Sequence, residues 1–276
     1  MIAIGSYNEL QLVRKVDFGV YLTDGEYDVL LPIRQVPPRA KQGDLLKVFV
    51  YTDSEDRPIA TMLRPKAVVG DFAMLKVVSV SAFGAFVDWG LEKDLLVPHS
   101  EQRYPLKEER GYVVRVLLDK ASNRVIGSTK LGKFLAADTS PLKDGQKVEA
   151  MFVQHTDDGT MAIVNNEFPA AIFPDEIFNP LRIGERRTAY IKRIREDGRV
   201  SLSLSPQGYE AVAAEAPGIL SMLKKNGGFL PYSDSTPPET IRAVFGMSKG
   251  SFKKLIGGLM KEGKIEISFH GIRLKE

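Results

Sequence analysis

Residues 80–87 read Val-Ser-Ala-Phe-Gly-Ala-Phe-Val, two strand-forming stretches that meet at a glycine. They are followed by Leu96-Val97-Pro98 and then by a polar hairpin that runs from Asp119 to Arg124. The chain repeats this order of features in two further copies, whose glycines are Gly19 and Gly159. Repetition at a period of roughly 65 residues is too long for a solenoid unit and suits tandem small domains. We therefore expect a string of similar modules.

The pattern inside each copy is that of β-strands. In the second copy, side chains between residues 72 and 80 alternate between two faces, which is the period of two of a strand. A glycine permits the sharp bend that follows, and Pro98 ends the third strand because proline cannot donate to a ladder. Five short strands, with one longer connection between the third and the fourth, are typical of the closed OB-fold barrel. The sequence thus predicts a mainly β protein with OB-fold barrels at residues 1–65, 66–134 and 135–206.

The hydrophobic period changes from two to 3.6 after residue 206. We expect one helix over Tyr209–Lys225, a second over Glu239–Phe245 that begins at a capping box on Thr236, and a third from Ser248 to about Glu262. A two-residue hairpin around His270-Gly271 follows. This order of elements is typical of a winged helix, so residues 207–276 are expected to form an α+β domain of that type.

The third of these helices has two features of interest. Outside its apolar stripe it carries Lys249, Lys253, Lys254 and Lys261, of which the first three are candidates for contacts with an RNA backbone. Its Gly257-Gly258 pair costs about 1 kcal/mol per glycine relative to alanine, so we expect another segment to approach the helix backbone closely there.

Composition excludes several classes of site. The chain has 276 residues and no cysteine, so disulfides and thiolate chemistry are absent. Its three histidines, His99, His155 and His270, are far apart and lack the spacing of metal ligands. No apolar run approaches the roughly 18 residues of a membrane span, and the N-terminus lacks the pattern of a signal peptide. A cytoplasmic protein without a metal, a cofactor or a membrane partner is the expectation.

Charge is distributed unevenly among the four segments, although the formal net charge of the chain is only +3. The first segment has eight basic and nine acidic residues, the second eleven and eight, the third nine and eleven, and the last ten and seven. A polyanion would be favoured by the second and the last segments.

The repeated motif resembles the RNA-binding repeat of ribosomal protein S-one, whose signature combines Phe-Gly-x-Phe-Val with a later Gly-Leu-Val-His-x-Ser stretch. The second copy matches best, with its Phe-Gly-Ala-Phe-Val run at 83–87 and Leu-Leu-Val-Pro-His-Ser at 95–100. The resemblance implies an outer surface with two aromatic residues, an acidic residue and an arginine. These positions are Phe83, Phe86, Asp119 and Arg124 in the second copy, and Phe18, Tyr21, Asp53 and Arg57 in the first.

Two departures from the S-one pattern affect what the copies are expected to do. Proline replaces the family histidine in all three copies, at Pro32, Pro98 and Pro174, and His99 is displaced by one residue. A displacement by one residue turns a side chain to the opposite face of a strand. The third copy has Asp158 and Met161 where the aromatic residues belong, so we interpret it as structural or as a surface for a protein partner or self-association.

Three such repeats followed by a winged helix resemble, over essentially the whole chain, the bacterial CvfB family of the YitL type. The resemblance implies an RNA-binding, post-transcriptional regulator of virulence genes without catalytic activity. Independently of the resemblance, exposed aromatic residues offer flat faces to unstacked bases, and nearby cations contact phosphates. Single-stranded RNA is therefore the expected partner.

Other interpretations of the same residues remain open at this stage. Phe83 and Phe86 could belong to the core of their barrel, and Trp89 could stack on ligand or shield the barrel end. The winged helix favours a DNA-binding transcription regulator as the alternative function, with duplex DNA as the partner. Asp157-Asp158 is the one cluster that suggests catalysis, but with Gly159 it more plainly predicts a turn, and no catalytic motif is visible.

Overall fold

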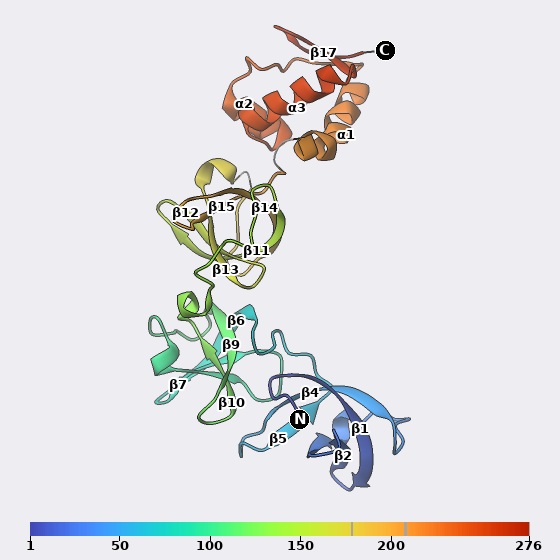
Figure 1. Cartoon of the computed structure of the whole chain (residues 1–276), viewed down its shortest axis with the longest axis vertical. Coiled ribbons are helices and arrows are strands. Elements are labelled where there is room, and N and C mark those ends of the chain that lie inside the picture. Colours follow the sequence, from blue (N-terminus) through green and yellow to red (C-terminus); the bar gives the residue numbers. More distant parts are fainter. Residues whose placement is uncertain (178, 207–208, 276) are drawn as a thin grey trace. The chain divides into compact units, whose positions relative to one another are not determined.

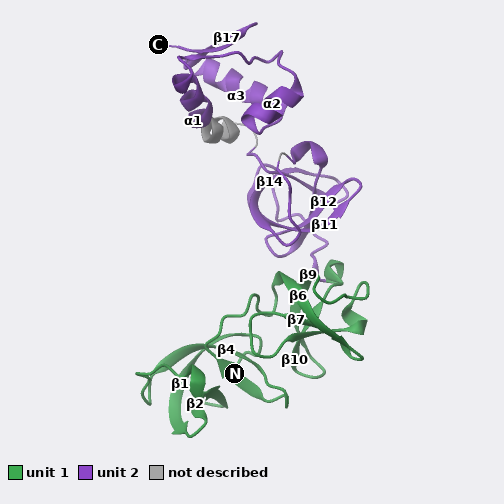
Figure 2. Ribbon diagram, turned by 180° about the vertical axis from the view of Figure 1, so that it is seen from behind, with its two compact units in different colours: residues 1–133 green, residues 134–276 purple. Residues whose placement is uncertain are grey.

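A computed structural model describes residues 1–177, 179–206 and 209–275 (Figure 1). It consists of three closed five-stranded β-barrels followed by a domain of three helices and a small sheet. The chain divides into two compact units, residues 1–133 and 134–276 (Figure 2). The first unit contains two barrels, and the second contains the third barrel and the helical domain. The predicted boundary between residues 206 and 207 falls where the described residues are interrupted.

The first barrel closes in the order β1-β2-β3-β5-β4. Its core is formed by inward-facing residues of the strands, such as Leu10 and Leu12 on β1 and Val48 and Val50 on β4. A parallel pairing of β3 with β5 closes it, with the 3-10 helix η1 (Ile33–Gln35) in the connection to β4. The strands are β1 (Ser6–Val16), β2 (Gly19–Thr23), β3 (Asp28–Pro32), β4 (Leu45–Thr52) and β5 (Pro58–Thr61).

The second and third barrels repeat this arrangement. The second has β6 (Phe72–Ser81), β7 (Gly84–Asp88), β8 (Leu95–Pro98), β9 (Gly111–Asp119) and β10 (Arg124–Ser128), with η2 (His99–Glu101) after β8 and η3 (Leu131–Phe134) after β10. The third has β11 (Lys147–Thr156), β12 (Gly159–Val164), β13 (Phe168–Ile172), β14 (Arg186–Ile194) and β15 (Val200–Ser203), with η4 (Pro174–Glu176) after β13. Residues 157 and 158 form the turn between β11 and β12, as predicted.

The repeated glycine has a steric reason in each barrel. A Cβ atom on Gly84 would lie 2.3 Å from the backbone oxygen of Val97, on the neighbouring strand, and the φ angle of Gly84 is 149°. Gly19 and Gly159 are equally close to the facing strand, with distances of 2.3 and 2.4 Å to a carbonyl oxygen. Only glycine fits where two backbones approach this closely, so the motif fixes the crossing of the strands.

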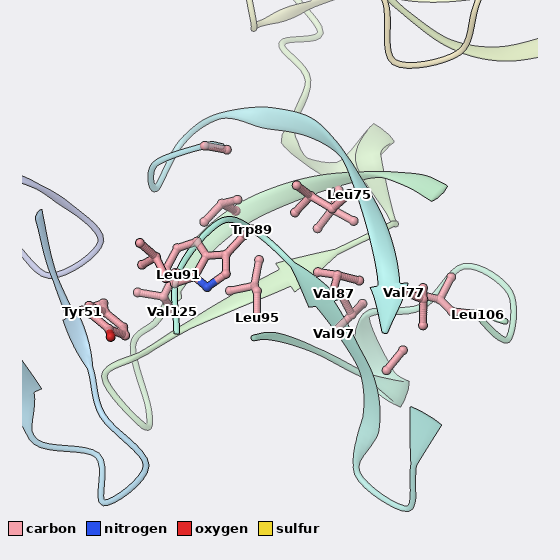
Figure 3. Packing of buried hydrophobic residues seen from close by; sticks show 14 of the residues in the cluster. Tyr51, Leu75, Val77, Val87, Trp89, Leu91, Leu95, Val97, Leu106 and Val125 are labelled. Atoms are coloured by element: carbon pink, nitrogen blue, oxygen red, sulfur yellow. The ribbon is translucent and has the colours of Figure 1, made fainter. Parts of the chain in front are cut away.

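The first two barrels share a hydrophobic core. Residues Phe49 and Tyr51 of β4 point away from the first barrel and pack against Trp89 of the second, with ring centroids 5.7 and 6.2 Å from the indole. Trp89 is 2% exposed, and its Nε1 donates a hydrogen bond to the carbonyl oxygen of Lys93 at 2.6 Å. Figure 3 shows Tyr51 beside Trp89, Leu91 and Val125 of the second barrel. Trp89 therefore joins the two barrels.

The C-terminal domain has the predicted winged-helix elements with one additional strand. Helix α1 (Tyr209–Lys225), α2 (Pro238–Phe245) and α3 (Lys249–Lys261) pack around a common core, and the wing strands are β17 (Ile265–Ser268) and β18 (Gly271–Leu274). The unpredicted strand β16 (Phe229–Leu230) pairs with β18. Gly271 belongs to β18 because it pairs with Ser268 of β17, so the two turn residues are Phe269 and His270, not His270 and Gly271. A Cβ on Gly271 would lie 2.1 Å from the carbonyl oxygen of Leu230.

The predicted cap of α2 is wrong and that of α3 is confirmed. Helix α2 has no side-chain cap; the Thr236 hydroxyl instead accepts a hydrogen bond from the amide of Ser233 at 2.9 Å. A Cβ placed on Gly257 would have no neighbouring atom within 4 Å among the described residues, so the close approach predicted for the Gly257-Gly258 pair does not occur at Gly257 and stays a prediction for Gly258. Ser248 does cap α3, since its hydroxyl accepts a hydrogen bond from the amide of Ser251 at 3.0 Å.

No helix in the described ranges has the length and apolar character needed to cross a lipid bilayer.

Candidate nucleic-acid interface

The predicted aromatic pair of the second barrel lies outside its core. Phe83 is in the turn before β7 and is 76% exposed, and Phe86 points outward from β7 between the buried Ala85 and Val87. Because the alternation of β7 sends Val87 inward, Phe86 must face the outer surface. The alternative that Phe83 belongs to the barrel core is wrong, and an exposed ring at this position is available to a ligand.

The first barrel has an equivalent aromatic pair with a different environment. Phe18 precedes β2 and is 58% exposed, whereas Tyr21 is half-buried on β2. The guanidinium of Arg14 lies 4.0 Å from the centroid of the Tyr21 ring, which is a cation–π contact. One face of Tyr21 is thus already covered, so Phe18 is the more accessible ring of this pair.

The two predicted aspartates organise the hairpins that bear them. The Asp53 carboxylate accepts hydrogen bonds from the amides of Glu55 and Arg57 and from the Arg57 guanidinium. Burial raises the pKa of Asp53, but these hydrogen bonds outweigh that effect, so the pKa lies below its ordinary value. Asp119 accepts from the hydroxyl and amide of Ser122, which lowers its pKa as well. Both carboxylates therefore accept hydrogen bonds from residues of their own hairpin turn.

Both predicted arginines are engaged in ion pairs. Arg57 contacts Asp53 and Glu55 of its own hairpin, each at 2.8 Å. Arg124 at the start of β10 contacts Asp56, which lies at the tip of the β4–β5 hairpin of the first barrel. Surface pairs of this kind contribute about 0 to 1 kcal/mol, so a phosphate is able to displace them.

A pocket of about 310 Å³ lies beside Phe83 and Phe86 where the two barrels meet. Its cations are Lys93 and Arg124, and the Lys93 ammonium donates a hydrogen bond to the carbonyl oxygen of Asp53 at 2.6 Å. Burial lowers the pKa of Lys93 from its ordinary value, and the carboxylate of Asp56 partly offsets this. Aromatic walls with two cations are suited to a base and its phosphate. Sequence reasoning did not find Lys93.

The strand register corrects the alignment of the third barrel. Gly19 faces Pro32 and Gly84 faces Pro98, whereas Thr160 faces Ile172, which places Phe173 opposite Gly159. Phe173, and not Pro174, therefore occupies the position of the other two prolines. The prediction that proline stands there in all three copies is wrong, because the third copy was aligned on its proline one residue too late.

The third barrel has a groove of its own, which includes Phe173. It measures about 720 Å³ and is lined by Met161, Phe173, Arg195 and Arg199, with Asp158 also present. The amide of Arg195 bonds to the carbonyl of Arg199 at 2.9 Å, as that of Asp53 does to Arg57 in the first barrel. An arginine thus takes the hairpin position of the aspartate, and an aspartate takes the turn position of the aromatic residue.

His99 follows β8 on η2, and its Nε2 lies 3.3 Å from the carbonyl oxygen of Ser81, next to the turn that carries Phe83. It is exposed, so it lies at the edge of the aromatic surface and not on the strand position of the family histidine.

The three candidate lysines of α3 differ in their surroundings. Lys253 and Lys254 are exposed, while Lys249 is half-buried at the first position of the helix. The ammonium of Lys253 lies 3.8 Å from the carboxylate of Asp234. Within the described ranges, no three His, Asp or Glu side chains are grouped so as to hold a metal ion.

Comparison with known proteins places the chain in a family. The sequence profile of the S1 domain, the S-one repeat, matches residues 4–63, and that of the CvfB-like winged helix domain matches residues 218–274. A protein of Bacillus subtilis named "Uncharacterized protein YitL" is 32% identical over 274 residues, which cover 95% of this chain and 90% of that protein. The chain belongs to the CvfB/YitL family.

Two further proteins are similar to the chain at lower identity. The "Conserved virulence factor B" of Staphylococcus epidermidis is 26% identical over 98% of this chain and 94% of its own length. A solved structure from Streptococcus pneumoniae, described as a multidomain protein with nucleic acid binding domains, is 28% identical over 98% of both chains, with a TM-score of 0.42. The CvfB/YitL chain described here combines an S1 domain with a CvfB-like winged helix domain in one polypeptide.

Proposed function

We propose that this CvfB/YitL protein binds single-stranded RNA in the cytoplasm and regulates gene expression after transcription. The observation that carries the proposal is the outward-facing aromatic pair of the exposed Phe83 and the half-buried Phe86 beside the cations Lys93 and Arg124. Each base stacked on such a ring contributes about 1 to 3 kcal/mol. Bases in a duplex are hidden within the helix, so loops and single strands are the RNAs that this surface reaches. The name of the staphylococcal relatives supports virulence genes as the regulated class.

The remaining predicted residues have supporting roles in this proposal. Phe18 and Tyr21 form a second stacking surface on the first barrel. Asp53 and Asp119 shape the hairpins that present Arg57 and Arg124 to phosphates. The protein itself performs no reaction on the RNA. Incubation of labelled RNA with the protein, with and without divalent metal, should therefore leave the RNA uncleaved.

The alternative function, a DNA-binding transcription regulator, rests on the winged helix. Its α3 reads Lys-Gly-Ser-Phe-Lys-Lys-Leu-Ile-Gly-Gly-Leu-Met-Lys and contains no Arg, Asn or Gln for bidentate contacts with base edges. Lysine attracts phosphate as a point charge but discriminates bases poorly. We infer that the winged helix assists RNA binding through Lys249, Lys253 and Lys254 and does not read a DNA sequence.

A competition titration separates the two functions. A fluorescein-labelled 24-nucleotide single-stranded RNA is bound to the full chain, and unlabelled RNA of the same sequence, duplex RNA or duplex DNA is added at a stated salt concentration. The single strand should compete at least ten times better than either duplex. Equal or better competition by duplex DNA would make transcription control the leading function.

A further inference from the structure

The pocket beside Phe83 and Phe86 has walls from two barrels. The second barrel contributes these rings with Lys93 and Arg124, and the first contributes Tyr51 and Asp56 from β4 and the hairpin that follows it. Its volume of about 310 Å³ is at the lower end of the range for small-ligand pockets, which suits one nucleotide and excludes a duplex. The lining residues lie on both sides of residue 63, where the S1 match ends, so the pocket is not formed by one repeat alone.

The wall from the first barrel is held in place before any ligand binds. The rings of Tyr51 and Trp89 are in edge-to-face contact at 6.2 Å between centroids, and both are buried. Lys93 of the second barrel donates to the Asp53 carbonyl at the base of the hairpin at 2.6 Å. A pocket with fixed walls avoids the ordering cost of closing around its ligand.

The tip of the same hairpin carries a carboxylate that faces the cations of the pocket. Asp56 adopts a φ of 63°, a left-handed conformation that Asp and Asn tolerate better than other residues with side chains. From there its carboxylate contacts the guanidinium of Arg124 and lies 3.9 Å from the Lys93 ammonium. A phosphate has the same charge sign and binds arginine with the same bidentate geometry. Asp56 therefore stands where a phosphate of bound RNA would have to go.

We propose that the first two barrels bind one nucleotide of a single-stranded RNA jointly, and that Asp56 competes with its phosphate for Arg124. The base stacks against Phe86 and Phe83, and the phosphate replaces the Asp56 carboxylate on the guanidinium. The inference rests on the proposed function and extends it, because it makes the first barrel a wall and a regulator of the site on the second. Removal of the Asp56 charge should strengthen RNA binding, whereas loss of an ordinary binding residue weakens it.

The substitution Asp56→Asn tests this competition in the full chain. Asparagine keeps the shape and tolerates the left-handed conformation, so the hairpin should be retained. The probe is a fluorescein-labelled 12-nucleotide oligouridine or oligoadenosine, titrated by anisotropy at one salt concentration. The variant should bind about three-fold more tightly, in line with the loss of one competing surface pair. The matched control Glu26→Gln removes the same charge from an exposed turn of the first barrel and should change the affinity much less.

A double-mutant cycle and cross-linking complete the test. In an Arg124→Ala background, Asp56→Asn should have no further effect beyond that of Glu26→Gln, because the competed group is gone. A 4-thiouridine probe should cross-link to peptides from residues 51–57 as well as 83–96. Unchanged or weaker binding by Asp56→Asn, an effect that survives without Arg124, or cross-links confined to the second barrel would overturn the inference. A wild-type chain that binds neither probe would instead refute the proposed function itself.

Discussion

The second and third barrels have the same strand order but place their surface residues differently. In the second barrel, aromatic rings occupy the turn before β7 and the strand itself, at Phe83 and Phe86. The third has Asp158 and Met161 at these positions and has an aromatic residue, Phe173, directly after the facing strand β13. What both barrels keep is the glycine between β-strands, because a backbone carbonyl lies within 2.4 Å of the missing Cβ. The fold constrains the glycine and leaves the surface free to change.

The largest effect is expected where the barrels agree. Gly84→Ala forces a Cβ against the Val97 carbonyl at a φ that other residues rarely adopt, and should lower the free energy of unfolding by about 3 kcal/mol. Gly132→Ala is the control, because no atom lies within 4 Å of a Cβ there and its φ is not positive. The melting temperatures of the two variants and the wild type are measured by thermal unfolding, monitored by circular dichroism. Equal melting temperatures would mean that the strands do not cross as closely as described.

The next largest effect concerns the residues by which the barrels differ. Phe83→Ala combined with Phe86→Ala should weaken binding to single-stranded RNA by about 2 kcal/mol or more, since two stacking faces are lost. Tyr104→Ala removes an exposed ring from the same unit, outside the pocket, and serves as the control. Anisotropy titrations give the affinities, and circular dichroism checks the fold. An intact fold with unchanged affinity would rule out stacking on this barrel.

Much of this comparison could be predicted from the sequence. The period of two, the glycine and the later change to a period of 3.6 predicted the barrels and the winged helix, because local patterns determine these elements. The joining of the first two barrels was missed, although Val48 to Tyr51 is hydrophobic on both strand faces and indicates a doubly buried strand. The hydrophobic pattern does not indicate which element covers the second face of this strand.

The site was predicted less completely for a related reason. Phe18 and Phe83 were found because the Phe-Gly motif is local, and they are exposed. Phe173 was missed because its position depends on strand register. The third copy was aligned with the others on Pro174, which lies one residue after the equivalent position. The pair of Arg124 with Asp56 joins residues 68 positions apart on two barrels, and no local pattern reports such a contact.

A gain of function would sharpen the comparison of the barrels. Asp158→Phe removes a carboxylate from the third groove and restores the aromatic residue of the turn, so affinity for single-stranded RNA should rise by about 1 kcal/mol. Asp157→Phe makes the same chemical change at the preceding exposed position, which does not line the groove. If both variants bind alike, the turn position does not determine binding by the barrel.

A smaller effect is expected from the winged helix. Deletion of residues 208–276 should leave the barrels folded and lower the affinity for a 24-nucleotide single-stranded RNA several-fold, because linked modules gain from effective concentration. Replacement of Lys253 and Lys254 by alanine in the full chain should give part of the same loss. A truncated chain with full affinity would show that this domain serves another partner.

The central claim is that stacking, more than charge, holds the RNA, and the salt dependence of affinity tests it most directly. The candidate arginines Arg57 and Arg124 are paired with carboxylates, so a phosphate must displace a carboxylate before it contacts either guanidinium. The full chain should show roughly three to six phosphate contacts, that is, a slope of about −2 to −4 in log affinity against log salt concentration on single-stranded RNA. Phe83→Ala with Phe86→Ala should lower the affinity at every salt concentration and leave that slope unchanged. A slope near −10, as steep as that of a dedicated duplex-DNA binder, would contradict the account.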